Sequence, residues 1–348
     1  MNRYRKQRNY GCRIHDAVTY QGMRTIVMEN ELVRVSILAD KGTDIFEFLY
    51  KPLDLDYMWL SEQGVHNPNA YLPTSPDAVS TFIDYYEGGW QEVFPNGGPP
   101  SGNAGAAFGQ HGEVAQMPWD VDIIEDVPER ITVRFSVRTK KLPCRLVKTL
   151  TLESGSAALT IHEQLDNESD VALRYMWGQH IALGQPFLSP GCVIELPQGV
   201  RIQTETPESE MSAPGRIRRG DSPLWPIASD HQGNELDLSI LPERETASDI
   251  VYLYGFESEA WYTVRNPSIQ AGLKVEWDGA VLPYLWYWQE FGASKGYPWY
   301  GRHYNIGLEP FAGYPTWGLE EAIHNGSAGT IGPRGRNQFT MRVTPFQL

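Results

Sequence analysis

The chain of 348 residues contains only three cysteines, Cys12, Cys144 and Cys192, and none of them belongs to a Cys-x-x-Cys pair. Three scattered thiols do not supply the disulfide framework of a small secreted domain. No run of apolar residues is long enough to cross a bilayer, and the basic residues 1–16 lead into no apolar segment of the kind that a secretory signal needs. These absences predict a cytoplasmic protein without a membrane span.

Basic side chains are scarce, because 29 lysines and arginines stand against 43 acidic residues and the formal net charge at pH 7 is −14. An excess of negative charge repels phosphate backbones and anionic lipid headgroups, so neither nucleic acid nor a membrane surface is an expected partner. The 11 tryptophans and 18 tyrosines favour a neutral, polar small molecule instead. A sugar fits this description, since the apolar face of a pyranose packs against an aromatic ring.

Long amphipathic helical patterns are absent, and short stretches of alternating apolar and polar residues take their place. Residues 25–50 show this alternation on both sides of a turn at residues 40–42, and residues 131–168 repeat it three times. Alternation with a period of two is typical of strands that bury one face. Further stretches of the same kind occupy residues 250–265, 272–278 and 326–346.

The 33 glycines and 25 prolines supply the turns that antiparallel strands need. The sequence therefore predicts an all-β fold, a large antiparallel β-sandwich with a few short helices in its loops, and a single domain over residues 1–348. Residues 60–107 are expected to form long connections with one or two short helices near residues 76–86, and residues 203–235 a surface excursion. Long ordered loops on a β-scaffold commonly carry functional sites.

Polar, titratable and aromatic residues are concentrated in four segments, which are residues 85–98, 108–119, 174–188 and 284–315. The order of these segments resembles the aldose 1-epimerase superfamily, the galactose mutarotase-like proteins. The likeness runs over essentially the whole chain, and it is closer to a divergent branch than to the galactose mutarotases themselves. It implies the galactose mutarotase-like β-sandwich, also called a supersandwich, and an isomerase that acts on a sugar.

Three matches to this superfamily occur in the right order. His111 stands in a His-Gly step shortly before a tryptophan, His180 follows a segment with a Glu, Asn and Ser pattern, and Glu309 lies in a Leu-Glu-Pro context. The flanking residues of these matches are Gly112, Trp119, Glu163, Asn167, Ser169, Leu308 and Pro310. The resemblance implies that Glu309 is the catalytic base, that His180 is the catalytic acid, and that His111 holds the ring oxygen or a neighbouring hydroxyl group.

Residues of these types suit the interconversion of anomers. A base takes the proton of the C1 hydroxyl while an acid protonates the ring oxygen; the ring then opens to an aldehyde, which rotates and closes to either anomer. A carboxylate and an imidazole accomplish this without a metal or a cofactor, so neither is expected. Because both roles reverse in the closing step, each group needs a pKa near the working pH.

Candidates for substrate binding come from the same segments. Trp286, Trp288 and Trp299 are dense enough to stack on a sugar, although core packing explains them equally well. His303 precedes Glu309 by an even number of residues, so on a common strand their side chains share a face, but a solvated loop residue is the favoured interpretation. The expected substrate-binding residues are Trp90, Gln91, Trp286, Trp288, Gln289 and His303, with Glu290 beside them.

Two features of the galactose mutarotases have no counterpart in this sequence. Residues 87–98 replace an arginine-containing block that precedes the His-Gly step, and no sugar-binding aspartate is identifiable between His180 and Glu309. The identity of the sugar therefore stays open, and an aldose other than galactose, or an aldose derivative, is favoured.

Other functions compete with anomer interconversion. An epimerase of hexose 6-phosphates, or of another anionic sugar, needs a basic cluster, and Arg216, Arg218 and Arg219 form the densest basic run. A non-catalytic sugar-binding protein keeps the pocket without the proton transfers. A glycosidase needs two facing carboxylates, and only Glu309 has an assigned place.

A metal enzyme is a further alternative, because His111, Glu113 and His180 offer imidazole and carboxylate ligands. Their spacing does not demand a metal, and none is expected. The sequence does not decide the oligomeric state, for which a homodimer is one option.

Overall fold

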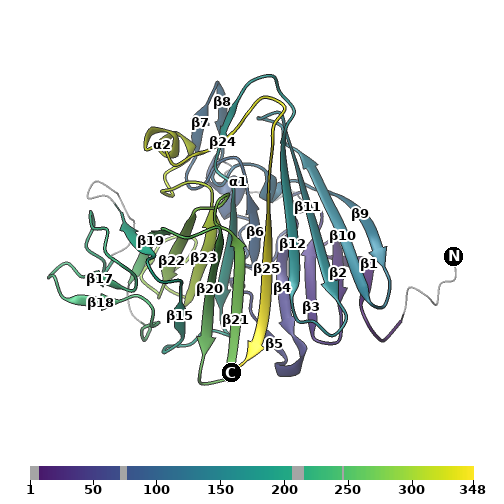
Figure 1. The fold of residues 1–348 in the computed structure, drawn as a ribbon, viewed down its shortest axis with the longest axis horizontal. Helices are drawn as coiled ribbons and strands as arrows, with labels where there is room; N and C mark the ends of the chain where they lie inside the picture. The colour runs from purple at the N-terminus through teal and green to yellow at the C-terminus, as the bar shows by residue number, and fades with distance from the viewer. Residues whose placement is uncertain (1–7, 71–76, 206–214, 245–246) are drawn as a thin grey trace.

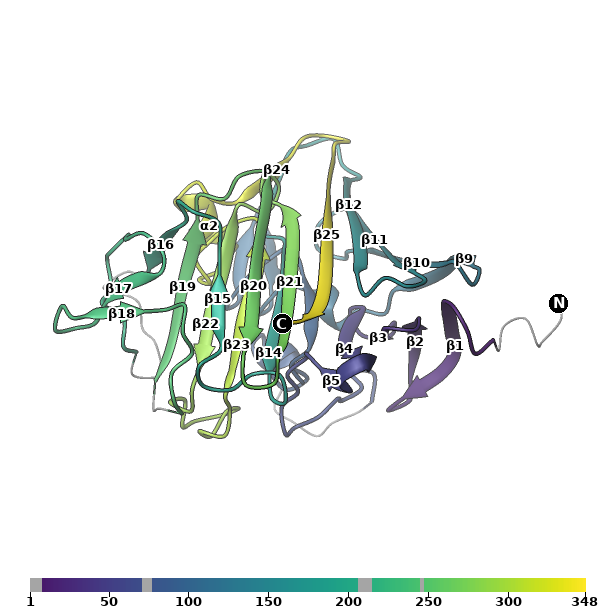
Figure 2. The same ribbon diagram turned by 60° about the horizontal axis from the view of Figure 1, so that its bottom comes forward.

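Two antiparallel sheets lie face to face and carry the fold (Figures 1 and 2). The computed structural model describes residues 8–70, 77–205, 215–244 and 247–348. Within these residues, one sheet has 11 strands and the other has eight. The all-β sandwich predicted from the sequence is thereby confirmed, whereas the extent of the single domain stays a prediction.

Figures 1 and 2 together label the strands of both sheets. The larger sheet runs through β1 (Arg13–Tyr20), β2 (Met23–Glu29), β3 (Val33–Leu38), β4 (Asp44–Tyr50), β6 (Trp90–Val93), β14 (Gly178–Gly184), β23 (Asn305–Phe311), β22 (Tyr284–Glu290), β19 (Ser248–Tyr254) and β16 (Arg201–Thr204), with β5 (Leu55–Asp56) paired to β4. The smaller sheet runs through β15 (Val193–Glu195), β20 (Glu259–Asn266), β21 (Ala271–Asp278), β25 (Arg336–Gln347), β12 (Leu159–Asn167), β11 (Cys144–Glu153), β10 (Arg130–Arg138) and β9 (Asp120–Asp126).

Short elements connect and flank the two sheets. The two-stranded pairs are β13 (Leu173–Tyr175) with β24 (Gly329–Ile331), β17 (Ile227–Ser229) with β18 (Glu235–Asp237), and β7 (Ser101–Asn103) with β8 (Ala106–Phe108). The helical elements are α1 (Ser80–Ile83), α2 (Leu319–His324) and the 3-10 turns Lys51–Leu53 and Val114–Gln116. In the described part of the chain, no helix combines the length and the apolar character that crossing a bilayer requires.

The strands of the smaller sheet bury alternate residues. In β10, Ile131, Val133 and Phe135 are buried while their neighbours are partly exposed, and β11 and β12 show the same alternation. One face therefore packs into the core and the other faces solvent. β10, β11 and β12 pair in chain order, which confirms the meander predicted for residues 131–168, and β3 and β4 form the pair predicted within residues 25–50.

The central strands of the larger sheet are buried on both faces. Every residue of β6, β14 and β23 is buried. Strands of this kind lose the alternation that identifies a half-buried strand, which is why the pattern in residues 60–107 predicts connections and not β6. The expected short helix near residues 76–86 is present as α1.

The expected excursion at residues 203–235 is described only in part, because residues 206–214 lie outside the described residues. The described remainder includes the β17–β18 hairpin, which lies beyond β19 in Figure 1, on the side of the larger sheet that ends at β16. The backbone N–H of Arg218, in the basic run, donates to Ser229 of this hairpin.

A buried ion-pair cluster joins the two sheets. Nζ of Lys148, on β11, lies 3.1 Å from Oε2 of Glu92 on β6 and 3.6 Å from Oε1 of Glu163 on β12. The indole N–H of Trp177 and the amide of Gln179 donate to the same Glu92 carboxylate at 2.5 and 2.9 Å. Burial acts to lower the pKa of Lys148, but the two carboxylates outweigh it and raise that pKa above its ordinary value. The lysine therefore stays charged in the core.

The substitution Lys148→Met removes the cation and leaves the carboxyl groups of Glu92 and Glu163 buried without a counter-charge. We expect the free energy of unfolding, measured by urea denaturation at pH 7, to fall by about 3–5 kcal/mol. Lys274→Met, on the partly exposed Lys274–Glu276 pair, is the control and should change it by less than about 0.5 kcal/mol. An equal effect of both substitutions would show that the buried cluster does not stabilise the sandwich.

Candidate active site

Neighbouring strands of the larger sheet align the candidate residues in rows. The register places Gln91 on β6 opposite His180 on β14, and Trp286 on β22 opposite Glu309 on β23. β14 and β23 pair Gly178 with Phe311 and Ala182 with Gly307, and this register sets His180 opposite Glu309. Residues that lie opposite each other in a sheet share a face, so Gln91, His180, Glu309 and Trp286 form one row on the face away from the smaller sheet.

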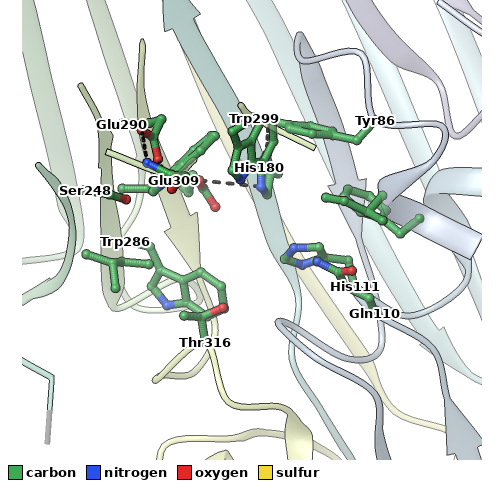
Figure 3. A pocket seen from close by; sticks show the side chains of 15 residues that line it. Tyr86, Gln110, His111, His180, Ser248, Trp286, Glu290, Trp299, Glu309 and Thr316 are labelled. Atoms are coloured by element: carbon green, nitrogen blue, oxygen red, sulfur yellow. Dashed lines mark hydrogen bonds and ion pairs between the residues drawn. The ribbon is translucent and has the colours of Figure 1, made fainter. Parts of the chain in front are cut away.

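A pocket of about 240 Å³ opens over this row (Figure 3). Its floor comes from β14, β19, β22 and β23, and its walls come from α1 and the loops around residues 110, 294–299 and 316. The lining residues are Phe82, Ile83, Tyr86, Gln110, His111, His180, Ser248, Ile250, Trp286, Trp288, Glu290, Ser294, Trp299, Glu309 and Thr316. The volume lies below the usual range of about 300–1,000 Å³ for small-molecule sites, which suits a single sugar ring.

The imidazole of His180 and the carboxyl group of Glu309 face each other on this floor. Nε2 of His180 lies 3.7 Å from Oε1 of Glu309, and both side chains are buried. Burial raises the pKa of Glu309 well above its ordinary value and lowers the pKa of His180 to about 4. Both shifts favour the uncharged forms, so the pair holds one titratable proton, and this proton resides on Glu309.

His111 presents a second imidazole to the pocket, at 5.1 Å between ring centroids from His180. The backbone N–H of Gly98 donates to its Nδ1 at 3.2 Å, so the neutral ring carries its proton on Nε2. Its backbone has a φ of 55°, in the left-handed region, and its N–H donates to the carbonyl of Gly98 at 2.9 Å. Burial and the neighbouring His180 hold the pKa of His111 well below its ordinary value, so the ring is a neutral hydrogen-bond donor.

Tyr86 contacts His180 from the wall, and sequence patterns do not single it out. Its hydroxyl oxygen lies 3.4 Å from Nδ1 of His180, and its ring stacks on Phe82 at 5.3 Å between centroids. Burial raises the pKa of Tyr86 well above its ordinary value, so it stays a neutral phenol. The aromatic segment 85–98 carries the signal that a site lies here, but not which ring reaches the imidazole.

Of the predicted substrate-binding residues, Trp286 and Trp288 line the pocket, whereas Trp90 and Gln289 do not. Side chains alternate between the faces of a strand, so Gln289 points away from the face that carries the two tryptophans. The amide oxygen of Gln289 accepts a hydrogen bond from Arg216 at 2.6 Å. The indole N–H of Trp90 donates to Gln179 at 2.7 Å on the core side. Neither residue is among those that line the pocket.

Gln91 and His303 are also absent from the lining, although both are buried. Gln91 lies on the pocket face, but its amide donates to the carbonyl of Gly88. His303 packs edge-on against Trp59 and Trp299, with ring centroids 5.1 and 5.2 Å apart. The interpretation of His303 as a solvated loop residue is therefore wrong, because the aromatic cluster behind the pocket encloses it.

Glu113 does not join His111 and His180, the other two residues considered as metal ligands. The carboxylate of Glu113 accepts hydrogen bonds from the backbone N–H groups of Lys140 and Lys141, at 3.0 and 3.1 Å. It is therefore engaged with another loop and not with His111 and His180. Among the described residues, no group of three or more His, Cys, Asp or Glu side chains is arranged to hold a metal ion.

The basic run that an anionic sugar requires also lies elsewhere. Arg216 pairs with Asp249 at 2.9 Å, and Arg218 pairs with Asp221 at 2.7 Å. Neither arginine, nor Arg219, lines the pocket, and no lysine or arginine is among its lining residues.

The fold is that of galactose mutarotase-like proteins, as solved structures show. A "putative aldose 1-epimerase" from Klebsiella pneumoniae superimposes with a TM-score of 0.71 at 15% identity, over 97% of this chain and 83% of the other. A galactose mutarotase-like protein from Lactobacillus casei gives 0.61 at 18% identity, over 92% and 100% of the two chains. A galactose mutarotase-like protein from Clostridium acetobutylicum gives 0.65 at 12% identity, over 97% and 99%.

The chain belongs to the family described as "Domain of unknown function (DUF4432)", whose model matches residues 20–223. No curated protein matches the sequence. The matched residues include His111 and His180, whereas Glu309 lies beyond them on β23.

The imidazole of His180 should stay uncharged down to a pH of about 4. An unfolded histidine titrates near pH 6.5, so the unfolded chain binds this proton first. His180 therefore lowers the free energy of unfolding as the pH falls from about 6.5 to about 4, and has no such effect at neutral pH. NMR of the imidazole signals measures the midpoint, with His180→Gln assigning the signal. A midpoint near 6.5 would mean that the ring is hydrated.

Proposed function

We propose that this protein interconverts the α and β anomers of a neutral aldose by general acid–base catalysis, as an aldose 1-epimerase does. One observation carries the proposal: His180 and Glu309 lie opposite each other, 3.7 Å apart, at the floor of a buried pocket. A second, neutral imidazole from His111 lies beside them. This is the set of groups that opening and closing a pyranose ring requires.

The steps follow from one base and one acid. Once the proton of the pair has moved from Glu309 to His180, the carboxylate of Glu309 takes the proton from the C1 hydroxyl, His180 gives its proton to the ring oxygen, and the bond between C1 and the ring oxygen breaks to leave an aldehyde. Rotation about the bond from C1 to C2 exposes the other face of the carbonyl, and the two transfers run in reverse to close the ring. The cycle leaves the atom count unchanged and returns both protons.

Transfers in both directions need one group that holds a proton and one that can accept it. Burial raises the pKa of the Glu309 carboxyl group and lowers that of the His180 imidazole, so the resting pair keeps its proton on Glu309. This proton must move to His180 before the ring opens. His111 donates from Nε2 to the ring oxygen or to a neighbouring hydroxyl, since Gly98 occupies its Nδ1.

The remaining lining residues favour a neutral sugar. Trp286, Trp288 and Trp299 offer aromatic surface to the C–H face of a pyranose. Gln110 offers a buried amide oxygen that has no hydrogen-bond partner within the protein, and a sugar hydroxyl supplies the missing donor. A phosphate would enter a pocket with no lysine or arginine among its lining residues, so an anionic sugar receives no support.

Glu290 brings a second carboxylate to the pocket, which a glycosidase would need. Its Oε1 accepts the backbone N–H groups of Gly292 and Ser294, at 3.1 and 3.3 Å, and its Oε2 accepts the Ser294 hydroxyl at 2.6 Å. Both oxygens are therefore engaged with the adjoining loop. We assign Glu290 to holding this loop and accepting sugar hydroxyls, and Glu309 to the proton transfer.

The proposal predicts faster exchange between anomers of a neutral aldose. NMR exchange spectroscopy on neutral aldohexoses and aldopentoses, a uronic acid and a hexose 6-phosphate, with the spontaneous rate subtracted, measures this directly. We expect acceleration of a neutral member, and a loss of about 10²–10⁴-fold in Glu309→Gln because the base is removed.

Glu276→Gln, on the solvent-exposed face of β21, is the matched control and should keep the wild-type rate. Binding of a sugar without acceleration would identify a sugar-binding protein. Release of an aglycone from an aryl glycoside would identify a glycosidase, and acceleration of the 6-phosphate alone would identify an anionic-sugar epimerase. Each of these outcomes overturns the proposal.

The rate should form a plateau in pH that spans neutrality. On the acid side it should fall near pH 4, where His180 gains a proton while Glu309 keeps its own, so that no base is left. On the alkaline side it should fall above the raised pKa of Glu309, where both groups are deprotonated and no acid is left. The dependence of kcat/KM on pH, after subtraction of the uncatalysed rate, measures both limits. An acid limb near pH 6.5 would contradict this assignment.

A further inference from the structure

Gly307 lies in the middle of β23, on the same face as Glu309 two positions later. Glycine weakens a strand interior, since it loses more conformational freedom on folding than other residues and has no side chain to pack. Its backbone does not require glycine, because its φ is not in the left-handed region. The property that matters at this position is therefore the missing side chain.

The carboxyl group of Glu309 occupies the space that a side chain at position 307 would fill. A Cβ atom built on Gly307 would lie 2.2 Å from Oε1 of Glu309 and 3.1 Å from its Cδ. The same Oε1 lies 3.7 Å from Nε2 of His180. Glu309 therefore folds back along its own strand, over Gly307, and reaches His180 from that position.

The neighbouring strands enclose this space. Ala182 on β14 and Trp288 on β22 lie opposite Gly307, on either side of it. Ala182 is fully buried, and Cε3 of Trp288 would lie 3.3 Å from the added Cβ. Two small residues and one large ring thus form a hollow in the sheet that holds one carboxyl group.

We propose that Gly307 is a positioning residue, whose missing side chain sets the carboxyl group of Glu309 at its working distance from His180. The effect on catalysis rests on the proposed function, whereas the effect on geometry does not. Gly307 does not contact the substrate itself, and it acts only through Glu309.

Other glycines of the larger sheet have a different role. A Cβ on Gly178 would lie 2.4 Å from ring atoms of Phe311, and one on Gly184 would lie 2.4 Å from the ring of Trp59. Those conflicts involve tightly packed aromatic rings, so these glycines serve packing. At Gly307 the nearest atom is the end of a flexible side chain, so an alanine fits when the carboxyl group of Glu309 moves aside and the fold is kept.

Gly307→Ala tests the proposal. Displacing a reacting group by about 1 Å costs up to about 10²-fold in rate, so we expect kcat for the neutral aldose to fall by about 10- to 100-fold. KM should change far less, because the tryptophans and hydroxyl-binding groups are untouched. Gly332→Ala is the control, since a Cβ at that position has no atom within 4 Å and its φ is not in the left-handed region; it should keep the wild-type kcat.

A rescue experiment separates positioning from general damage to the strand. Glu309→Asp shortens the side chain by one methylene group, so its carboxylate no longer reaches the space over Gly307. Adding Gly307→Ala to Glu309→Asp should then cost less than about 2-fold, far less than in the wild-type background. Additive losses in the double variant would overturn the proposal.

The pH midpoint of the His180 imidazole, followed by NMR, reports on the geometry without any turnover. It should move in Gly307→Ala, because the neighbouring carboxyl group has moved, and should stay at the wild-type value in Gly332→Ala. If the wild type accelerates no sugar while this midpoint moves, the proposed function fails and the positioning role stands. If the wild type is active and Gly307→Ala keeps both its kcat and its midpoint, the positioning role is overturned.

Discussion

The strands β6, β14 and β23 are buried on both faces, and the rest of the structure depends on this constraint. One face packs against the smaller sheet, and on β14 and β23 the other face forms part of the pocket floor. Because successive side chains alternate between faces, a single strand serves both. Gln179 reaches the core cluster while the next residue, His180, reaches the pocket.

The buried titratable groups on the two faces of the larger sheet differ in their charge state. On the core side, the ammonium group of Lys148 lies beside the carboxyl groups of Glu92 and Glu163, so a buried positive charge faces acidic groups. On the pocket side, burial shifts the pKa values of Glu309 and His180 towards their uncharged forms, and no lysine or arginine lines the pocket to oppose this. The first arrangement keeps a buried lysine charged. The second leaves a proton that can move, which is the property that acid–base chemistry uses.

The site residues that the sequence predicted correctly are those that lie in recognisable sequence motifs. His111, His180 and Glu309 lie in separate segments, yet they line one pocket, as their order along the chain indicates. Trp90, Gln91, Gln289 and His303 came from equally polar and aromatic segments but do not line it, because strand alternation or covering loops direct their side chains elsewhere. The sequence did not identify Tyr86 or Gly307 as site residues. A tyrosine in an aromatic segment and a glycine in a strand are both common, and only the tertiary structure shows that these two contact His180 and Glu309.

The sequence by itself determined the all-β class, the antiparallel pairs and meander of its outer strands, and the net negative charge, because these follow from local alternation, turn residues and composition. It also determined which segments carry the titratable groups. The tertiary structure alone decided which face of β14, β22 and β23 lines the pocket, which carboxylates meet a cation, and how far His180 lies from Glu309. The reason is physical: doubly buried strands show no alternation, and pKa shifts arise from burial by residues far apart along the chain.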